Sequence, residues 1–224
     1  DLLVSSIQLM FIGHLGANEL AAAALGSSFY KVTGLCVIIG LLSAVDTLVS
    51  QSYGAKKYKQ VGEACNMGLI VVISTSIVIL PLYLFSGRIL LWLHQDPDVA
   101  ELTALYIQVS WLQVIPFGIV SILRKFLQNQ NIVNPLIISG FINIVLTTIS
   151  IIIMLYVFEW GFVSLPLNML FCNILSITYL SIVILYKKLW QKTYSPFTWN
   201  TFKGLPEFYK LAIPGMLMGC AEWW

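Results

Sequence analysis

The sequence predicts an all-α protein: a polytopic transmembrane helix bundle made of a six-helix lobe and the start of a seventh helix. Four stretches contain no Asp, Glu, Lys or Arg, and each is long enough for a helix of roughly 20 apolar residues to cross a bilayer. They are residues 64–87, 102–123, 126–158 and 160–186. Charged residues make up only 10% of the 224, whereas soluble domains contain about 25%. This composition excludes an ordinary soluble domain.

Seven helical segments can be placed along the chain, the first and the last of them partial. Glycine and proline punctuate the connections between the segments. Proline also occurs inside four of them, where it is expected to kink or weaken the helix. These internal prolines are Pro81, Pro116, Pro166 and Pro214. The expected segments are about 2–12, 20–52, 60–87, 99–127, 134–158, 163–189 and 205–224.

This pattern divides the chain into three parts. We expect residues 1–190 to form an amino-terminal transmembrane lobe of helices one to six, with the first truncated. Residues 191–204 are expected to be a cytoplasmic linker between lobes. Residues 205–224 would then begin helix seven of a second lobe that is missing from this sequence.

The basic residues indicate an orientation. If the helices alternate in direction, ten of the twelve fall on one side of the membrane, while Arg88 and a group of acidic residues fall on the other. Because Lys and Arg are enriched in cytoplasmic loops, the even-numbered connections are predicted to be cytoplasmic. We expect an integral, multi-pass protein of the plasma membrane. The ten basic residues are Lys56, Lys57, Lys59, Arg124, Lys125, Lys187, Lys188, Lys192, Lys203 and Lys210.

Asp46 is a charge deep in the second segment, where it should face protein or a water-filled cavity. Ser43, Thr47 and Ser50 share its helix face and could donate hydrogen bonds to it. The residue could belong to an ion or proton relay, or it could tie its helix to a neighbour near the cytoplasmic mouth. Its closeness to the lysines at 56–59 favours the structural interpretation.

Glu222 follows an apolar run and precedes Trp223 and Trp224. A carboxyl group held away from water could exchange protons near neutral pH, and the tryptophan rings could face a bound cation. Alternatively, the tryptophans could form an interfacial belt with Glu222 near the outer membrane surface. The pattern alone leaves both interpretations open.

Other polar residues inside the segments have structural interpretations as well. Lys31 could line a cavity, although its position favours a side chain that reaches toward the outer headgroups. Asn143, Asn168 and Asn173 are expected to make hydrogen bonds between helices.

Several classes of function lack support in the sequence. There is no phosphate-binding glycine loop, no catalytic triad pattern and no clustered metal ligands, and only two histidines are present. We therefore expect no enzyme activity, no cofactor, no metal and no nucleic-acid partner.

Short motifs spread over the whole chain resemble multidrug and toxin extrusion (MATE) transporters of the animal type. The most recognisable is the stretch from Gly40 to Ala55, which includes Asp46. The others are Phe11–Gly16 with Glu19–Ala22, Gln95–Val99, Leu127–Gln130, and Leu211–Pro214 leading to Glu222–Trp224.

The resemblance implies two six-helix lobes around a central cavity, and export of small, cationic molecules in exchange for protons or sodium by alternating access. It assigns proton and cation binding to Glu222. The residues that could line the cavity or pack helices are Asp46, Gln8, Lys31, Asn143, Trp223 and Trp224. Gln8 stands where bacterial members carry a coupling aspartate, and Lys31 stands at a usually neutral position, where a cation would repel cationic substrates.

Two other classes stay open at this point. A flippase-like exporter of lipids or lipid-linked molecules, of the same superfamily, would share the bundle. A non-transporting scaffold, or an inactive truncated fragment, would show no substrate flux.

Overall fold

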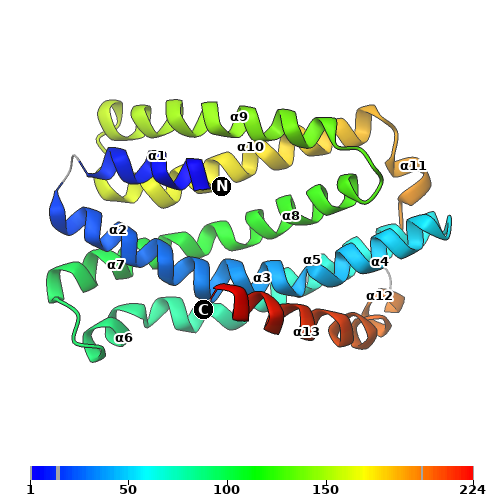
Figure 1. Ribbon diagram of the computed structural model, residues 1–224, viewed down its shortest axis with the longest axis horizontal. Helices are drawn as coiled ribbons and strands as arrows, with labels where there is room; N and C mark the ends of the chain where they lie inside the picture. The colour runs from blue at the N-terminus through cyan, green and yellow to red at the C-terminus, as the bar shows by residue number, and fades with distance from the viewer. Residues whose placement is uncertain (1, 14–15, 198, 224) are drawn as a thin grey trace.

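The computed structural model describes residues 2–13, 16–197 and 199–223, and the regular structure in these ranges is all helical. The long helices run side by side along an elongated bundle (Figure 1). Five helical runs are long and apolar enough to cross a membrane, which confirms the predicted polytopic bundle. These runs are Ala17–Gly54, Tyr58–Leu84, Pro97–Gln128, Asn134–Val157 and Gly161–Tyr186. Two shorter helices, α1 (Leu2–Ile12) and α13 (Leu205–Trp223), account for the first and last expected segments.

The second segment was expected to be one uninterrupted helix, but the structure divides it. It consists of α2 (Ala17–Tyr30), the π-helix η1 (Lys31–Leu35), α3 (Cys36–Leu41) and α4 (Ser43–Gly54). Within η1, Gly34 faces Tyr83, and a Cβ at this glycine would lie only 2.3 Å from the tyrosine hydroxyl. The wider π turn thus coincides with a close helix contact that only glycine permits.

The fourth segment is interrupted for a different reason. It runs as α7 (Pro97–Ser110), a 3-10 turn η2 (Trp111–Gln113) and α8 (Val114–Gln128). Pro116 has no backbone N–H to donate to the carbonyl four residues earlier, so the α-helical ladder is broken within the preceding turn. In the third segment, α5 (Tyr58–Leu84) ends three residues after Pro81, and α6 (Ser86–Trp92) follows.

The second half of the chain is more regular. Its long helices are α9 (Asn134–Ile152), extended by the π-helix η3 (Ile153–Val157), and α10 (Ser164–Tyr186), preceded by the 3-10 turn η4 (Gly161–Val163). Two short helices, α11 (Trp190–Thr193) and α12 (Trp199–Lys203), occupy the expected linker and pack against α5.

Four helices end in the same tight turn. At each, a residue with positive φ follows the helix, and its amide and the next one donate to carbonyls of the last turn, as in a Schellman motif. None of the four is glycine: they are Lys56, His94, Asn131 and Lys188. These turns make the helices alternate in direction. The connections after α4, α8 and α10 lie at one end of the bundle, and the α6–α7 and α9–η4 connections lie at the other (Figure 1). We call the first end lysine-rich, because the connections after α4 and α10 contain lysines and Lys125 lies in the last turn of α8.

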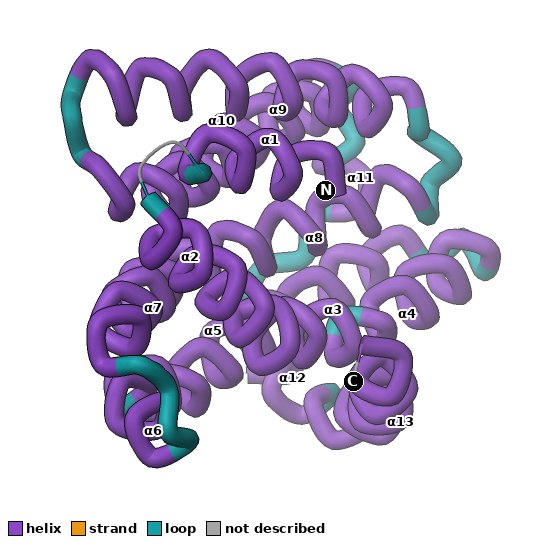
Figure 2. The backbone as a smooth tube through the Cα atoms, turned by 60° about the vertical axis from the view of Figure 1, so that its left-hand side comes forward, coloured by secondary structure: helices purple, strands orange, loops and turns teal. Residues whose placement is uncertain are grey.

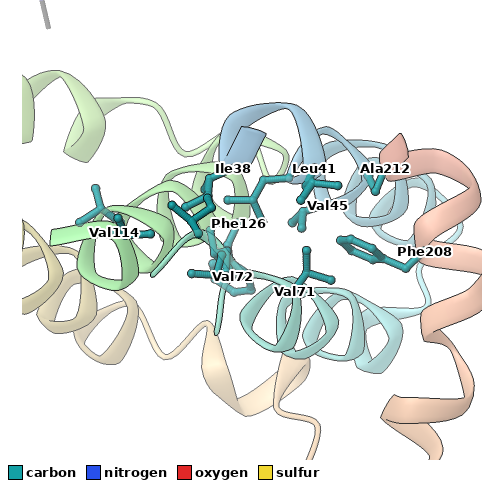
Figure 3. Packing of buried hydrophobic residues seen from close by; sticks show 14 of the residues in the cluster. Ile38, Leu41, Val45, Val71, Val72, Val114, Phe126, Phe208 and Ala212 are labelled. Atoms are coloured by element: carbon teal, nitrogen blue, oxygen red, sulfur yellow. The ribbon is translucent and has the colours of Figure 1, made fainter. Parts of the chain in front are cut away.

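The apolar core has two parts. The larger one joins α3, α4, α5, α8 and α13, and includes Ile38, Val45, Val72, Phe126 and Phe208 (Figure 3). A smaller cluster joins α1, α2, α7 and α10 around buried Ile12, Tyr106 and Leu165. The smaller cluster leaves α13 out, and the backbone view likewise places α13 at the edge of the bundle beside α3 and α4 (Figure 2).

Candidate functional site

The contact between α3 and α13 is built from residues without bulky side chains. A Cβ at Gly40 would lie 2.5 Å from the Met216 Cα, and one at Gly215 would lie 1.9 Å from the Ser43 hydroxyl oxygen. Gly219 comes one turn later and also faces Gly40. The spacing of Gly215 and Gly219 is the small-xxx-small pattern that lets two membrane helices approach closely. The two backbones touch here because side chains are absent.

This close contact fixes the depth of Glu222. Two residues before it, the Cys220 sulfur lies 3.4 Å from that of Cys36. Cys36 sits close to the centre of the continuous run Ala17–Gly54, and the carboxyl end of α13 lies near the middle of the bundle's length (Figure 1). Glu222 is therefore level with the middle of the second span.

The surroundings of Glu222 are open on this chain. Its side chain is exposed and interacts electrostatically with the Cys36 thiol. Among the described residues it has no carboxylate-to-ammonium ion pair and no hydrogen bond. The side chain of Trp223 and the whole of Trp224 lie outside the described part, so the structure gives no cation-facing ring at this position.

Asp46 has a different environment. One carboxylate oxygen accepts a hydrogen bond from the Lys125 ammonium, and the other accepts one from the Asn129 amide at 3.1 Å. Both donors lie on α8, so Asp46 ties α4 to α8 near the lysine-rich end of the bundle.

The hydroxyl groups that were expected to donate hydrogen bonds to Asp46 donate to backbone carbonyls instead. Ser43 donates to the Gly40 carbonyl at the end of α3, and Thr47 and Ser50 each donate to a carbonyl three or four residues earlier on α4. The expectation that they bond Asp46 was wrong. A hydroxyl on a helix reaches its own preceding turn more easily than a side chain beside it.

The remaining predicted site residues make no hydrogen bond or ion pair with Glu222 among the described contacts. Gln8 is buried on α1, and its amide nitrogen has no hydrogen-bond partner among the described residues. Lys31 is half-buried at the start of η1, within the helical run Ala17–Gly54.

The three asparagines within the spans differ in their hydrogen-bond partners. The Asn168 amide donates across helices to the Ser150 hydroxyl at 2.9 Å and to the Thr147 carbonyl, as expected. Asn143 instead accepts from Thr147 within its own helix at 3.2 Å, so its expected interhelical bond is wrong for the described contacts. Asn173 has no side-chain hydrogen bond in the described part.

Sequence reasoning missed the partners of Asp46 and the glycine contact. Lys125 was read only as a loop charge, although an acid and a base near the same end of two spans are a signal for an ion pair. The spacing of Gly215 and Gly219 was also visible in the sequence. Across residues 2–13, 16–197 and 199–223, no three His, Cys, Asp or Glu side chains converge as metal ligands.

With this geometry in place, comparison with known proteins is decisive. The family model described as MatE matches residues 2–154. The chain belongs to the MATE family. It is 34% identical to multidrug and toxin extrusion protein 1 of Mus musculus, and 35% identical to the Homo sapiens protein of that name, each over 99% of this chain.

The solved structures agree. The eukaryotic MATE transporter AtDTX14 aligns with a TM-score of 0.94 and 27% identity, covering 99% of this chain and 49% of that one. An inward-facing MATE transporter of the MOP superfamily aligns with a TM-score of 0.82 at 14% identity, a likeness of fold alone. The chain spans about two fifths of the length of the curated relatives, 39% for both mammalian proteins.

Proposed function

We propose that the protein is a secondary active exporter of small organic cations, which exchanges its substrate for protons by alternating access. Membership of a family whose relatives are named for multidrug and toxin extrusion supports this class of activity. The observation that carries the coupling mechanism is Glu222, a carboxylate at mid-span depth with no ion-pair partner among the described residues.

An acid in this position can hold one of two ligands. When Glu222 is ionised, it attracts a cationic substrate, and when it is protonated it no longer does. Proton and substrate thus compete for one carboxylate. Each shifts the balance of inward- and outward-open states only by its difference in affinity for the two, so the exchange is coupled.

The helix that carries Glu222 has a role in this proposal. We place α13 at the start of a second lobe, with residues 191–204 as the linker between lobes and residues 1–190 as the first lobe. The α3–α13 contact is then a contact between lobes. When the cavity opens, α13 must either keep its close contact with α3 at Gly40 and Gly215 or slide along α3 at these glycines.

We further propose that the lysine-rich end of the bundle faces the cytoplasm. The connections after α4, α8 and α10 share that end, and Lys and Arg enrichment is typical of cytoplasmic loops. Because export of a compound from the cell requires a transporter at its boundary, we place the protein in the plasma membrane.

The test uses Glu222→Gln in proteoliposomes loaded with a quaternary ammonium cation. An imposed pH gradient should drive transport by the parent protein, and the variant should lose about 100-fold or more of that rate, as for removal of an essential proton carrier. Glu207→Gln is the matched control, because Glu207 lies in the first turn of the same helix, is exposed, and is far from the centre.

Parental rates in Glu222→Gln would remove this residue from the mechanism. Replacing the pH gradient with a sodium gradient separates the two coupling ions: transport driven by sodium alone would contradict proton coupling while leaving the exporter class intact.

A further inference from the structure

Four lysines surround one pocket at the lysine-rich end of the bundle. Lys56 and Lys57 come from the connection between α4 and α5, Lys59 comes from the first turn of α5, and Lys192 comes from α11. Tyr58 and Gln60 complete a lining that contains no acidic residue, and the pocket has a volume of about 440 Å³. Two segments separated by more than 130 residues in sequence thus bring like charges to the same hollow.

Specific contacts hold Lys192 in this place. The carbonyl oxygen of Thr193 would lie 2.1 Å from a Cβ at Gly62, so α11 is seated directly on α5 where a side chain is missing. The Asn66 amide donates to the Ser195 carbonyl at 3.1 Å and holds the next residues against the same helix. The position of Lys192 therefore follows from packing between α11 and α5.

The four ammonium groups are not neutralised by the protein. Within the described ranges, the one ion pair found joins Lys125 to Asp46, and it involves none of the pocket lysines. All four lysines are exposed, so their ammonium groups can pair with an anion from outside the protein.

The place of the pocket narrows the choice of anion. It opens beside the first turn of α5 and the end of α4, where both helices leave the apolar part of the membrane. At this level the anions at high local density are lipid headgroups, and clusters of lysines next to membrane spans attract them. The volume is within the range of sites that hold a sugar-sized group.

We propose that this pocket binds the phosphomonoester headgroup of an anionic membrane lipid, such as a phosphorylated phosphatidylinositol. Such a headgroup carries more than one negative charge on groups with several acceptor oxygens, which suits a hollow lined by four lysines and no acidic residue. A headgroup with a single phosphodiester charge leaves most of the lysines unpaired and should bind less tightly. The proposal is independent of the transport mechanism.

The experiment titrates fluorescent phosphatidylinositol 4,5-bisphosphate into the detergent-purified protein, with phosphatidylglycerol as the singly charged comparison. In a variant with Lys56, Lys57, Lys59 and Lys192 all changed to Gln, we expect the Kd to rise about 600-fold, because each of the four lysines near a headgroup contributes about fivefold. Changing the same four residues to Arg keeps the charge and should leave the Kd within about threefold.

Lys187→Gln with Lys188→Gln is the matched control, since these lysines lie at the same end of the bundle but do not line the pocket. An equal loss in this control would mean diffuse attraction and overturn the pocket. Equal affinity for the two lipids would overturn the phosphomonoester assignment. Equally tight binding of soluble inositol 1,4,5-trisphosphate, or displacement of the lipid by inorganic phosphate at similar concentration, would overturn the lipid as the source.

Discussion

Two helix contacts on the second span differ in what holds them. Where α3 meets α13, glycines remove side chains and the backbones touch, with Gly40 facing Met216. Where α4 meets α8, Asp46 reaches across to the Lys125 ammonium and the Asn129 amide. The first contact depends on shape and the second on charge. Lipid tails are as apolar as the helices, so close packing and polar bonds are the main means of joining helices in a membrane.

This difference determines how sensitive each contact is to substitution. The glycine contact cannot accommodate a larger side chain, since a methyl group added to a glycine of one helix would push against the backbone of the other helix. An ion pair tolerates small shifts, because a lysine side chain is long and flexible. We therefore expect substitutions at the α3–α13 contact to cost more than those at the α4–α8 contact.

The largest effect is expected for Gly40→Ala. Its new Cβ would lie 2.5 Å from the Met216 Cα, which can yield only if the backbone of α13 moves. We expect a loss of stability of about 2 kcal/mol, as for overpacked cores. Gly140→Ala is the control, because a Cβ there meets nothing within 4 Å and should stabilise its helix by up to about 1 kcal/mol. Thermal unfolding monitored by size-exclusion chromatography compares the two.

Cross-linking gives an independent measure of the same contact. The Cys36 and Cys220 sulfurs lie 3.4 Å apart, so copper-phenanthroline, which takes up the two electrons while two protons are released, should join them as a disulfide. Cys220→Ser should abolish this product, and Gly40→Ala should reduce it. Equal stability of Gly40→Ala and Gly140→Ala, with undiminished cross-linking, would show that the close approach carries no cost.

A smaller effect is expected for the ion pair. The side chains of Lys125 and Asp46 are 18% and 42% exposed, so their interaction is partly screened by water. Asp46→Asn should destabilise the protein by about 1 kcal/mol, between the values for exposed and fully buried pairs. A double-mutant cycle with Lys125→Gln isolates the pairwise part. A coupling energy of zero in that cycle would mean that the two residues act separately.

The smallest effect concerns a third contact, between α9 and α10. Asn168→Leu removes the amide that donates to Ser150 and should cost about 0.6 kcal/mol, the average for hydrogen bonds between membrane helices. Asn143→Leu should change stability by less, since the side chain of Asn143 bonds only within its own helix among the described residues. A larger loss in Asn143→Leu than in Asn168→Leu, measured by the same unfolding assay, would contradict this ranking.

The sequence was sufficient for the spans because a membrane imposes one strong rule. A long uncharged stretch must satisfy its backbone internally, so Ala64 to Gly87 could be assigned to a helix from composition alone. The structure places that helix at Tyr58–Leu84. The interruption before Pro116 arises from the missing amide of that proline, so it could be expected from the sequence. Helix α5, in contrast, continues through Pro81 to Leu84.

The contacts between helices were harder to predict. Partners such as Asp46 and Lys125 are 79 residues apart, and their pairing depends on how α4 and α8 are rotated about their axes. The π-helix at Lys31–Leu35 coincides with another such contact, between Gly34 and Tyr83, whose residues are 49 positions apart in the sequence. The coupling role of Glu222, expected from family resemblance, stays a prediction.

The π-helix also changes the angular phase of the second span. Gly26 faces Tyr106 of α7 on one side of η1, and Gly40 faces α13 on the other. In an unbroken α-helix two residues 14 positions apart point about 40° apart, whereas one π turn adds a lag of roughly a quarter turn. The helical run Ala17–Gly54 can therefore pack against α7 and α13, although these two helices lie in different directions from it. The number of residues between these glycines, more than the identity of those residues, sets the angle at which α13 meets the rest of the bundle.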